Sequence, residues 1–530
     1  ADAAKATGDE ILVAEGTYTG TDSEGVLVLV GSDWNLMIRG GYSNDFLVCD
    51  PDVYVTVIDG ELQRRGVRLD GGAALSIGGF TVTRGNSEWG GGISVKQSSL
   101  LEAKGCIVVG NASTNGGNDV GGGVYATLGS EVLLSDCQIV SNAARWGGGI
   151  FCISSETSVQ MNRCTVLRNS AQSFGGGVTV LQGGGIDAEQ TVFSANEVLE
   201  GSGGAVRFGP FGTVSLDSCT ISGNCVIDVV LPDVDGGGGI FIGGTSIGDS
   251  VLTIDNSIVF GNHAGLGSDL RVGDYSESYA FIHVSHSCIG DIHGYLTSSN
   301  NVVRRDPMFA DPASGDFHLL YGSPCIDTGD PEYSSTTLDL DGEPRPFGAR
   351  IDMGADEFVD ADGDSMADYW EEREYGSVLT TEGTEDTDGD LLGTFGEYMA
   401  QTDPHDGDTD GDSMPDGWEI TNGLNAKEDD SALDSDHDTM KNSAEYMADT
   451  DPQDADSRLR LNRIYPERGG MRLEWQGGIQ AAQWLESSGD LESDDWDTLF
   501  AVPPPTPTNN AVIVFDSRPI RLYRVRAARE

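Results

Sequence analysis

Basic residues are scarce in this chain of 530 residues. Lys and Arg together number 30, against 86 Asp and Glu, so the formal net charge is −56. A molecule of this sign repels phosphate backbones and anionic lipid headgroups, which excludes nucleic acid as a partner and argues against an anionic membrane surface. We therefore expect cations to be its ionic partners.

Long apolar runs are also absent. No stretch of about 18 apolar residues occurs, so the sequence predicts no transmembrane segment. Residues 1–20 carry neither a basic leader nor an apolar signal core, and we interpret the chain as a mature form whose signal peptide has been removed. This interpretation places the protein outside the cell or on a bacterial cell surface.

Proline is sparse, at 18 residues, whereas glycine reaches 74. The glycines follow no three-residue period, which excludes collagen and predicts a fold with many tight turns. The cysteines number nine, which is odd, and several recur at one place in a repeat. We therefore expect buried free thiols rather than a disulfide framework.

A glycine-rich tripeptide followed by a β-branched residue recurs through the first half of the chain. Successive copies are 26 to 34 residues apart, which suits one turn of a three-sided coil with loops. Between the copies, short alternating apolar runs bounded by Gly and Asn are typical of strands. The copies end at Ile93, Val124, Ile150, Val178, Val206 and Ile240.

Each coil also carries a short apolar run that ends in Asn. Coils stacked about 4.8 Å apart place equivalent residues above one another, so we expect these Asn side chains to hydrogen bond along the stack. Cysteines that precede the same runs predict a buried column of small side chains. The Asn residues are Asn111, Asn142, Asn169, Asn196, Asn224 and Asn262, and the cysteines are Cys106, Cys137, Cys164 and Cys219, with Cys288 as an expected later member.

These repeats resemble the right-handed parallel β-helix family, called pectin-lyase-like, which includes bacterial polysaccharide lyases. The GGAV that ends at Val206 and the FSAN from Phe193 to Asn196 are also similar to paired motifs of polymorphic outer-membrane proteins. The resemblance implies a fold more than an activity. We predict a mainly β protein in which residues 1–304 form a right-handed parallel β-helix.

Residues 305–358 contain the stretches RDPMFADPASGDFHLLYGSPCIDTGDP and LDLDGEPRPFGARIDMGADEF. They resemble a choice-of-anchor-type module that follows β-helices in many secreted bacterial proteins. Because the last coil of a β-helix exposes unpaired strand edges, we expect this module to cover that coil. Its isolated apolar residues are Phe309, Phe317, Leu319, Ile326 and Ile351.

Residues 359–457 are strongly acidic. From Asp360 to Asp456 there are 31 acidic and 3 basic residues, a net charge of −28. Such density is also typical of a disordered tail, but the spacing predicts four twelve-residue loops with ligands at positions 1, 3, 5, 7, 9 and 12, of which position 7 offers a carbonyl. In chain order the loops offer Asp360, Asp362, Asp364, Met366, Asp368 and Glu371; Asp386, Asp388, Asp390, Leu392, Thr394 and Glu397; Asp408, Asp410, Asp412, Met414, Asp416 and Glu419; and Asp434, Asp436, Asp438, Met440, Asn442 and Glu445.

Calcium suits these loops because this hard cation takes six to eight oxygen ligands at roughly 2.3–2.6 Å. The spacing resembles EF-hand loops and, more closely, bacterial thrombospondin type 3 repeats. Position six, where Gly is usual, holds Ser365, Leu391, Ser413 and Thr439. A left-handed backbone there costs roughly 1–2 kcal/mol per residue. We expect calcium binding to be coupled to folding.

Residues 458–530 are less acidic and alternate polar with apolar residues, which predicts a small C-terminal β-domain. Trp475, Trp484, Trp496 and Tyr523 either form its core or present a sugar-stacking face, and we favour the core. The segment is similar to small terminal β-modules of secreted bacterial surface proteins, which implies a role in attachment or sorting.

Three aromatic residues precede the glycine triplets, so we expect Trp89, Trp146 and Phe174 to align in one column, with Val120 in the intervening coil. Such a column either binds glycans by stacking or shields a corner of the coil. We favour the corner, because aromatic side chains also fill space between coils.

No catalytic constellation is evident in the sequence. Asp119, Asp233, Asp235 and Arg207 lie near the glycine turns, yet no spacing joins them into a site. A group of His, Cys and Asp residues of irregular spacing is a weaker candidate for metal binding. This group comprises His283, His286, Cys288, Asp291 and His293.

The sequence as a whole predicts a secreted or cell-surface, calcium-stabilised β-helix protein with a non-catalytic role in adhesion, structure or extracellular assembly. Its expected partners are calcium, glycans or other cell-surface components, and further copies of itself in a fibre or surface layer. Two alternatives stay open. One is a secreted polysaccharide lyase or glycoside hydrolase acting on acidic glycans, and the other is a non-catalytic carbohydrate-binding protein.

Overall fold

The computed structural model describes residues 10–114, 117, 119–228, 236–243, 250–273, 280–333, 337–378, 383–489, 495–515 and 521–529. The chain divides into two compact units, Ala1–Val359 and Asp360–Glu530. Strands account for 42% of the structure and helices for 6%, which confirms a mainly β fold.

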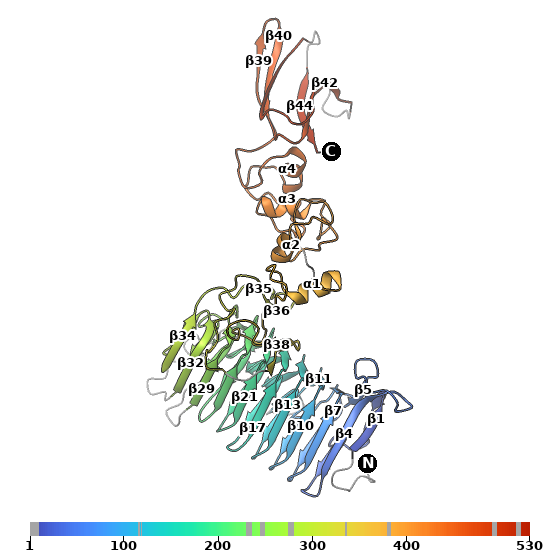
Figure 1. Ribbon diagram of the computed structural model, residues 1–530, viewed down its shortest axis with the longest axis vertical. Coiled ribbons are helices and arrows are strands. Elements are labelled where there is room, and N and C mark those ends of the chain that lie inside the picture. The colour runs from blue at the N-terminus through green and yellow to red at the C-terminus, as the bar shows by residue number, and fades with distance from the viewer. Residues whose placement is uncertain are drawn as a thin grey trace. The chain divides into compact units, whose positions relative to one another are not determined.

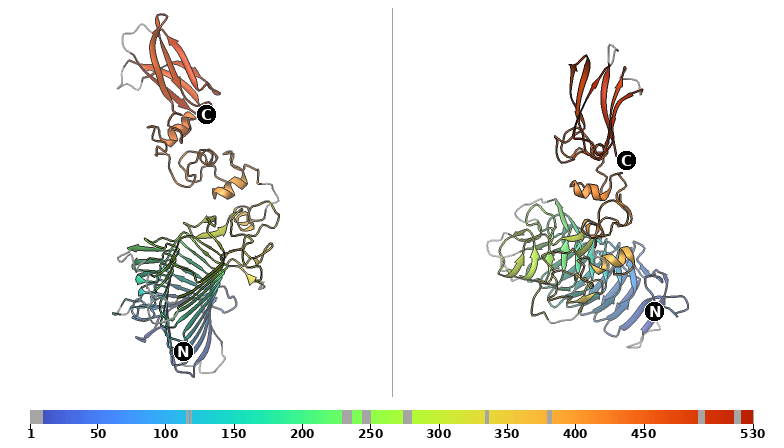
Figure 2. Two further views of the ribbon diagram at one scale, coloured as in Figure 1. Left: turned by 90° about the vertical axis from the view of Figure 1, so that its left-hand side faces the viewer. Right: turned by 45° about the horizontal axis from the view of Figure 1, so that its top comes forward.

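The first unit is built on a right-handed parallel β-helix of about nine turns, coloured from blue to green in Figure 1. A typical turn contributes one strand to each of three faces. Each strand pairs in parallel with the equivalent strand of the next turn, so the turns stack in register (Figure 2). The fold predicted from the glycine and asparagine repeats is therefore confirmed.

The strands of each face succeed one another along the stack. The first face comprises β1 (Glu10–Ala14), β4 (Asn35–Tyr42), β7 (Ala74–Gly78), β10 (Leu100–Lys104), β13 (Glu131–Ser135), β17 (Ser158–Asn162), β21 (Gly185–Glu189), β25 (Thr213–Asp217), β29 (Ser250–Asp255), β32 (Ala280–Ile289) and β34 (Ser298–Val303). The second face comprises β2 (Gly16–Tyr18), β5 (Thr56–Asp59), β8 (Phe80–Thr83), β11 (Ile107–Val109), β14 (Gln138–Val140), β18 (Thr165–Leu167), β22 (Val192–Ser194), β26 (Thr220–Ser222) and β30 (Ile258–Val259), and it joins the first face through β32.

The third face and a short corner ribbon complete the turns. The third face comprises β3 (Leu27–Val30), β6 (Val67–Asp70), β9 (Ile93–Lys96), β12 (Val124–Thr127), β16 (Ile150–Ile153), β20 (Val178–Leu181), β24 (Val206–Phe208), β28 (Ile240–Ile242), β31 (Leu270–Val272) and β33 (Ile292–His293). The corner ribbon between the second and third faces comprises β15 (Ala143–Trp146), β19 (Ser170–Phe174), β23 (Glu197–Glu200) and β27 (Cys225–Asp228).

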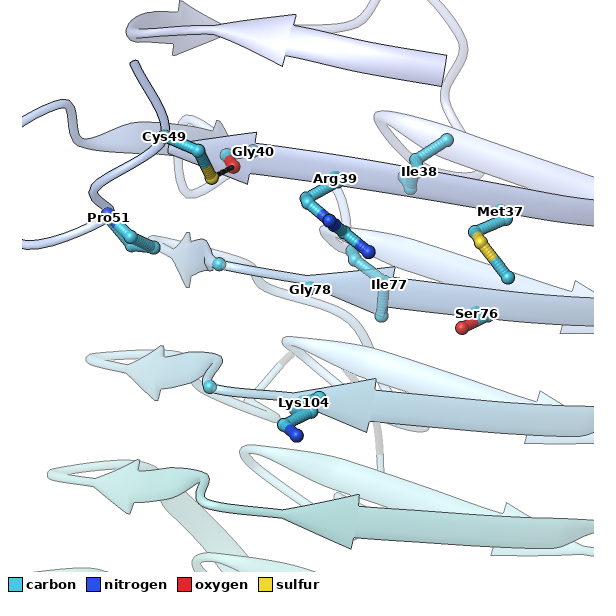
Figure 3. A pocket seen from close by; sticks show the side chains of 12 residues that line it. Met37, Ile38, Arg39, Gly40, Cys49, Pro51, Ser76, Ile77, Gly78 and Lys104 are labelled. Atoms are coloured by element: carbon cyan, nitrogen blue, oxygen red, sulfur yellow. Dashed lines mark hydrogen bonds between the residues drawn. The ribbon is translucent and has the colours of Figure 1, made fainter. Parts of the chain in front are cut away.

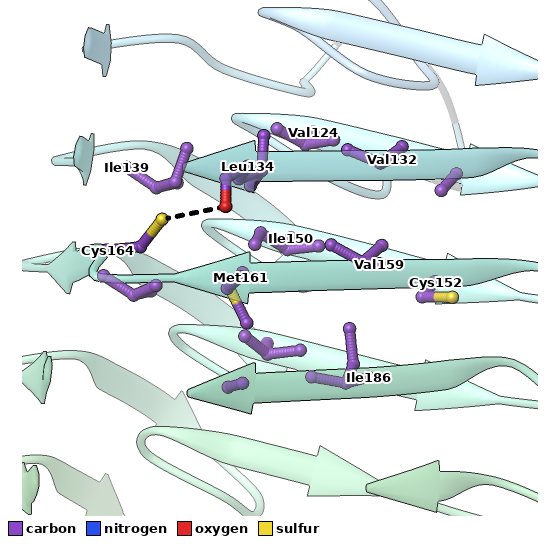
Figure 4. Close-up of a cluster of buried hydrophobic side chains, with 14 of the residues drawn as sticks. Val124, Val132, Leu134, Ile139, Ile150, Cys152, Val159, Met161, Cys164 and Ile186 are labelled. Atoms are coloured by element: carbon purple, nitrogen blue, oxygen red, sulfur yellow. Dashed lines mark hydrogen bonds between the residues drawn. The ribbon is translucent and has the colours of Figure 1, made fainter. Parts of the chain in front are cut away.

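The interior of the β-helix is filled by alternate apolar residues of the strands on its three faces (Figure 4). In β13, Val132 and Leu134 point inward and lie opposite Val159 and Met161 of the next turn. Apolar side chains therefore stack on the equivalent apolar side chains of the next turn. This stacking buries apolar surface along the whole β-helix and favours one register. Each fully buried Val, Leu or Ile contributes about 1.5–3 kcal/mol of transfer free energy.

The predicted asparagine ladder is confirmed. From Asn111 to Asn262, each side-chain amide donates to the amide oxygen of the Asn in the next turn, at 2.8–3.0 Å. At the end of the ladder, Asn262 donates to the Asp269 carboxylate at 2.9 Å. These buried polar groups are thus satisfied within the stack.

The cysteine column is confirmed in part. Cys106, Cys137, Cys164 and Cys219 are buried free thiols, and the backbone N–H of Cys106 donates to the Cys137 sulfur at 3.5 Å. The inclusion of Cys288 was wrong, because the column continues through Ser257 and Ser287. Cys288 is one residue further along the strand, opposite Ile258.

The glycine triplets form the turns before the third face. Gly147 has a φ of +64°, a left-handed conformation that glycine adopts without steric cost. At Gly148, an added Cβ would lie 2.3 Å from the carbonyl oxygen of Ser170 and 2.6 Å from that of Gly176. The triplets are therefore required by the close approach of neighbouring turns.

The segment over residues 305–358, hereafter the flanking segment, packs along the second face. It contains two small antiparallel pairs, β35 (Phe309–Asp311) with β36 (Asp316–Leu319), and β37 (Thr337–Leu338) with β38 (Pro344–Arg345). Its apolar side chains contact Val192, Ile258 and Cys288, which belong to different turns.

This placement differs from the predicted cover over the last coil. Phe317 and Ala355 pack on Val192, and the N–H of Ala355 donates to the Thr220 hydroxyl at 3.0 Å. Val192, Thr220 and Ile258 occupy successive turns of the second face. The flanking segment therefore shields the side of several turns, and at the last turn it also contacts β34, where the Asn301 side chain donates to the Thr328 carbonyl at 3.2 Å.

Within its described residues, the second unit contains four short helices and six strands. The helices are α1 (Asp368–Tyr375), α2 (Thr394–Ala400), α3 (Asp416–Thr421) and α4 (Asn442–Ala448). The strands are β39 (Arg460–Glu467), β40 (Gly470–Gln476), β41 (Ala482–Ser488), β42 (Asp497–Val502), β43 (Asn509–Val514) and β44 (Leu522–Ala528). In the part of the chain that the structure describes, no helix has the length and apolar character needed to cross a membrane.

The six C-terminal strands form two antiparallel three-stranded sheets around Leu473, Trp475 and Leu485. Tyr523 packs against this core, as predicted. Trp484 and Trp496 were wrongly assigned to it, because they are half-exposed and lie under the guanidinium groups of Arg526 and Arg524, at 4.1 and 4.2 Å.

Candidate metal centre

Each acidic loop folds around the aspartate at its first position. In the first loop, Asp360 accepts hydrogen bonds from the backbone N–H groups of Gly363 at 2.7 Å and Ser365 at 3.0 Å. Asp386, Asp408 and Asp434 accept comparable pairs of backbone bonds in the other loops. These bonds close a tight turn from which alternate side chains converge.

Two residues of each loop have a left-handed backbone. Position six is left-handed although it lacks Gly, with φ between +76° and +85° at Ser365, Leu391, Ser413 and Thr439. Sequence reasoning missed position four, where φ is +68° to +87°. Position four holds Gly363, Gly389, Gly411 and His437.

The carboxylates at positions one, three and five come together. In each of three loops, one oxygen from each of these side chains lies within 4.8 Å of the other two. In the fourth loop, the N–H of Asp438 donates to both Asp434 and Asp436 at 3.0 Å, which draws the same three positions together. The three groups are Asp360, Asp362 and Asp364; Asp386, Asp388 and Asp390; and Asp408, Asp410 and Asp412.

The glutamate at position twelve is buried in every loop. Because each helix begins at position nine, position twelve lies one turn into it. Burial, followed by the charges of the loop aspartates, raises the pKa of Glu397 and Glu419 to about 8 and that of Glu445 to about 7. The four residues are Glu371, Glu397, Glu419 and Glu445.

Several carboxylate oxygens are buried without a hydrogen-bond partner. They include both oxygens of Glu419 and one each of Glu397 and Glu445. The same holds for one oxygen of the position-three residues Asp388, Asp410 and Asp436, and of Asp364 at position five. A buried carboxylate without a partner is costly, and a bound cation would remove that cost.

The donor set fits calcium. It consists of carboxylate oxygens, which hard cations such as Ca²⁺ prefer over soft ones. Position seven is anchored beside this set, because its N–H donates to the aspartate at position five at 2.7–2.9 Å. The position-seven residues are Met366, Leu392, Met414 and Met440. Ligation by their carbonyls stays a prediction.

The side chains at position nine also make hydrogen bonds within the loop, and their ligation of a metal ion stays a prediction. Asp368 and Asp416 accept the N–H of position two at 2.8 and 2.9 Å, and Asn442 does so at 3.4 Å. Thr394 instead donates its hydroxyl to the Glu385 carbonyl at 2.8 Å. These side chains are thus engaged in holding the loop to the start of the helix.

Neighbouring loops are linked to one another. The second oxygen of Asp390 accepts the N–H of Gly417 at 2.6 Å, and that of Asp412 accepts the N–H of Ser431 at 3.1 Å. Rings also meet between loops, with centroids 5.0 Å apart for Trp418 and Tyr446. Order in one loop is therefore transmitted to the next.

The predicted aromatic column is also present. Trp89, Val120 and Trp146 pair in successive turns, and Trp146 lies opposite Phe174, with 5.7 Å between the two ring centroids. Trp89 is 38% exposed, whereas Trp146 and Phe174 are half-buried.

Cationic side chains line the same column. Lys96 lies 4.8 Å from the Trp89 ring, Arg145 lies 5.3 Å from the Trp146 ring, and Arg207 lies 4.0 Å from the Phe174 ring. Burial is the main reason that the pKa of Lys96 falls to about 8. Sequence reasoning named Arg207 only as an isolated residue near the glycine turns, and it missed Lys96 and Arg145, because the repeat motifs do not show that they meet the aromatic rings.

A surface pocket of about 480 Å³ lies over the first turns (Figure 3). Arg39 and Lys104 line it, and the thiol of Cys49 contacts the carbonyl oxygen of Gly40 at 3.8 Å. Its lining contains no Asp, Glu or His, so it offers no pair of carboxylates for glycoside hydrolysis.

The remaining candidates from the sequence are dispersed. His283 lies 3.7 Å from Asp255, His286 bonds to Ser285 at 2.9 Å, and Cys288 is buried against the flanking segment. His293 lies on β33 of another face, and Asp291 accepts the N–H of Ser268. The structure thus gives these residues different neighbours.

Arg207, as described, stacks on Phe174. The Asp119 carbonyl accepts the N–H of Arg145 at 3.0 Å. Asp233 and Asp235 lie outside the described residues.

A comparison with curated proteins finds no match to this chain. Residues 56–193, from β5 into β22, match the family described as right handed beta helix region. The first unit of the chain therefore contains the parallel β-helix that this family describes, in agreement with its stacked and registered turns.

Proposed function

We propose that this is a secreted or cell-surface β-helix protein that is stabilised by calcium and has a non-catalytic role in adhesion, structure or extracellular assembly. The observation that carries the calcium part is Glu419. Its side chain is fully buried, neither carboxylate oxygen has a hydrogen-bond partner, and the charges of Asp410 and Asp412 act on it. A dication bound in this loop would balance the negative charges of Glu419, Asp410 and Asp412 together.

The proposed binding couples calcium to the fold of the acidic segment. Three or more carboxylates within a few ångströms repel one another strongly when no cation lies between them. Bound calcium turns this repulsion into attraction, so the loops fold as the ions bind. Sites of modest affinity suffice outside the cell, where calcium sites with a Kd of roughly 0.1–1 mM are typical.

Calorimetric titration of the full chain with CaCl₂ tests this proposal. We expect heat of binding in the wild type and the loss of one site in Glu419→Gln, because the neutral amide supplies a weaker ligand and removes one charge. Glu428→Gln is the matched control, since Glu428 is an exposed acid of the same segment. Absence of calcium uptake by the wild type would overturn the proposal.

The non-catalytic role has a separate test. An eliminase assay with acidic glycans at alkaline pH in the presence of calcium detects unsaturated products. We expect none to form. Their appearance would favour a polysaccharide lyase instead, and a rise in reducing ends without unsaturation would favour a glycoside hydrolase.

The aromatic column supports a second candidate function, the binding of anionic glycans. Its rings lie beside Lys96, Arg145 and Arg207, in a protein with a net charge of −56. Aromatic faces stack on sugar rings and cations pair with carboxylates or sulfates, so this column offers both contacts.

Glycan-array binding by Trp89→Ala tests the second candidate. We expect weaker binding to acidic glycans, whereas Phe211→Ala, an exposed aromatic residue away from the column, should leave binding unchanged. If Trp89→Ala lowers the melting temperature and leaves binding intact, the column serves packing alone.

A further inference from the structure

Three side chains from separate parts of the flanking segment meet beside the second face. His318 lies on β36, Asp341 lies between β37 and β38, and Asp356 follows β38. One ligand atom from each lies within 4.8 Å of the other two. The imidazole Nε2 of His318 is 3.2 Å from Asp341 Oδ2 and 3.9 Å from Asp356 Oδ1.

Asp356 directs a buried, unsatisfied oxygen toward this group. Its side chain is only 9% exposed, and its Oδ2 accepts the N–H of Leu319 at 2.9 Å. Its Oδ1, the atom that faces His318, has no hydrogen-bond partner. A carboxylate oxygen buried in this way requires a cation close by.

The imidazole is oriented for ligation. Its Nδ1 lies 2.6 Å from Asp316 Oδ1. When Nδ1 donates to that carboxylate, the lone pair of Nε2 faces Asp341 and Asp356. A carboxylate on the far nitrogen of a metal-binding His fixes the ring and raises its basicity.

A second group of acids adjoins the first. One oxygen each from Asp339, Glu343 and Asp356 lies within 4.8 Å of the others. The Asp339 carboxylate accepts four backbone N–H groups, whereas burial and the charges of Asp339 and Asp356 raise the pKa of Glu343 to about 8. Negative charge is therefore in excess here.

The same excess of negative charge acts on the pKa of His318. Burial disfavours the imidazolium, but the hydrogen bonds to Asp316 and Asp341 and the charge of Asp356 outweigh burial and raise its pKa to about 11.

We propose that His318, Asp341 and Asp356 form a binding site for a transition-metal dication of the zinc class, distinct from the calcium loops. Ligands at about 2.0–2.1 Å from a tetrahedral zinc lie about 3.3 Å from one another. Asp341 Oδ2 has this spacing, at 3.2 Å from Nε2, whereas Asp356 Oδ1, at 3.9 Å, has to move closer when the ion binds. One imidazole and two carboxylates neutralise a dication.

The surroundings leave room for a fourth ligand. A cavity of about 170 Å³ is lined by His318, Asp341 and Asp356 together with Thr165 and Thr220 of the second face. It admits water, which completes the coordination of zinc at sites with three protein ligands. The imidazole also favours zinc over calcium, which takes oxygen ligands.

The test is calorimetric titration of the full chain with ZnCl₂ while calcium at about 1 mM saturates the acidic loops. We expect Asp341→Asn to bind one zinc ion fewer than the wild type. The Asp341 side chain is 48% exposed, so this variant should keep its fold, which circular dichroism checks. Asp316→Asn should retain the stoichiometry and weaken zinc binding about 10–100-fold.

His263→Gln is the control, because His263 has an exposed side chain on the β-helix outside this group. It should bind as much zinc as the wild type. Equal zinc stoichiometry in the wild type and Asp341→Asn would overturn the proposal and leave protonated His318 as the cation of the group. This result would not bear on the calcium loops, whose occupancy is measured separately.

Discussion

At the scale of single residues, the acidic loops hold side chains in a conformation that normally favours glycine. Leu391 has a φ of +80°, and its side chain is 90% exposed. The left-handed backbone costs roughly 1–2 kcal/mol, and the exposed side chain gains no packing in return. In the calcium-bound state that we propose, the convergence of the carboxylates around the cation would offset this strain.

We expect Leu391→Gly to stabilise the calcium-bound protein by about 1 kcal/mol, since relief of the strain exceeds the extra chain entropy of glycine. Scanning calorimetry of the full chain in saturating calcium measures the change.

Leu433→Gly is the matched control, an exposed Leu in the same segment that lacks a positive φ. It should lower stability or leave it unchanged. A stabilisation of equal size in both variants would show that backbone strain is not the cause.

The cysteines differ in their exposure to solvent and therefore to reagents. Cys49 is exposed, whereas Cys152 and Cys219 are fully buried free thiols. Burial raises the pKa of Cys152 to about 12 and raises that of Cys219 further. Because the thiolate is the nucleophile, both burial and this shift slow alkylation.

We therefore expect iodoacetamide at about pH 8, near the ordinary thiol pKa, to label Cys49 and to spare Cys152 and Cys219 until denaturant is added. Peptide mass spectrometry measures labelling with time. Similar labelling rates at the three positions in the folded protein would contradict the interior placement.

Residue types and spacing were enough to predict that the carboxylates at positions one, three and five converge. Spacing did not predict that Asp368 and Asp416 at position nine accept hydrogen bonds from the backbone of position two, and the role of all these residues as calcium ligands stays a prediction. Whether a carboxylate faces inward or toward its own loop depends on the helix that starts there. No spacing encodes that choice.

At the scale of elements, the turn of the β-helix is determined by glycine as much as by apolar strands. We expect Gly148→Ala to destabilise the first unit by roughly 2–3 kcal/mol, because the new methyl group overlaps the carbonyl of Ser170. Thermal unfolding followed by circular dichroism measures the loss.

Gly185→Ala provides the comparison. Gly185 lies in β21 with a negative φ, and its Cβ would lie 3.8 Å from the nearest atom, an ordinary contact. This variant should melt near the wild-type temperature. An equal loss in both variants would mean that crowding between turns is not the constraint.

The strands of the β-helix were predictable because each turn repeats the same alternation, so one signal is seen several times. The flanking segment lacks such repetition. Phe317 and Leu319 were recognised as apolar anchors, but the surface that they cover is determined by contacts with Val192 and Ile258, far away in sequence. Likewise, His318, Asp341 and Asp356 share no spacing that identifies a group.

At the scale of the whole molecule, charge is divided unevenly. Residues 360–456 carry −28 of the net −56, and several buried carboxylate oxygens of this segment, including both of Glu419, have no hydrogen-bond partner. The β-helix depends instead on apolar stacking and amide ladders, which do not involve metal ions. Removal of calcium should therefore affect the two units differently.

We expect chelation with EGTA to raise hydrogen exchange throughout α1 to α4 and to leave the strands of the β-helix protected. Exchange followed by mass spectrometry reports both in one experiment, and added calcium should restore protection. Unchanged exchange in the helices after chelation would contradict a structural role of calcium.

The hydrogen bonds of the asparagine ladder from Asn111 to Asn262 all run in one direction along the stack. Within the series, each Asn amide donates to the Asn of the next turn and accepts from the Asn of the previous one, and the Asp269 carboxylate accepts the last bond. A complete winding can thus be duplicated or deleted inside the series without leaving an unmatched donor or acceptor. The β-helix can therefore become longer or shorter in evolution by whole turns, while Asp269 remains the last acceptor.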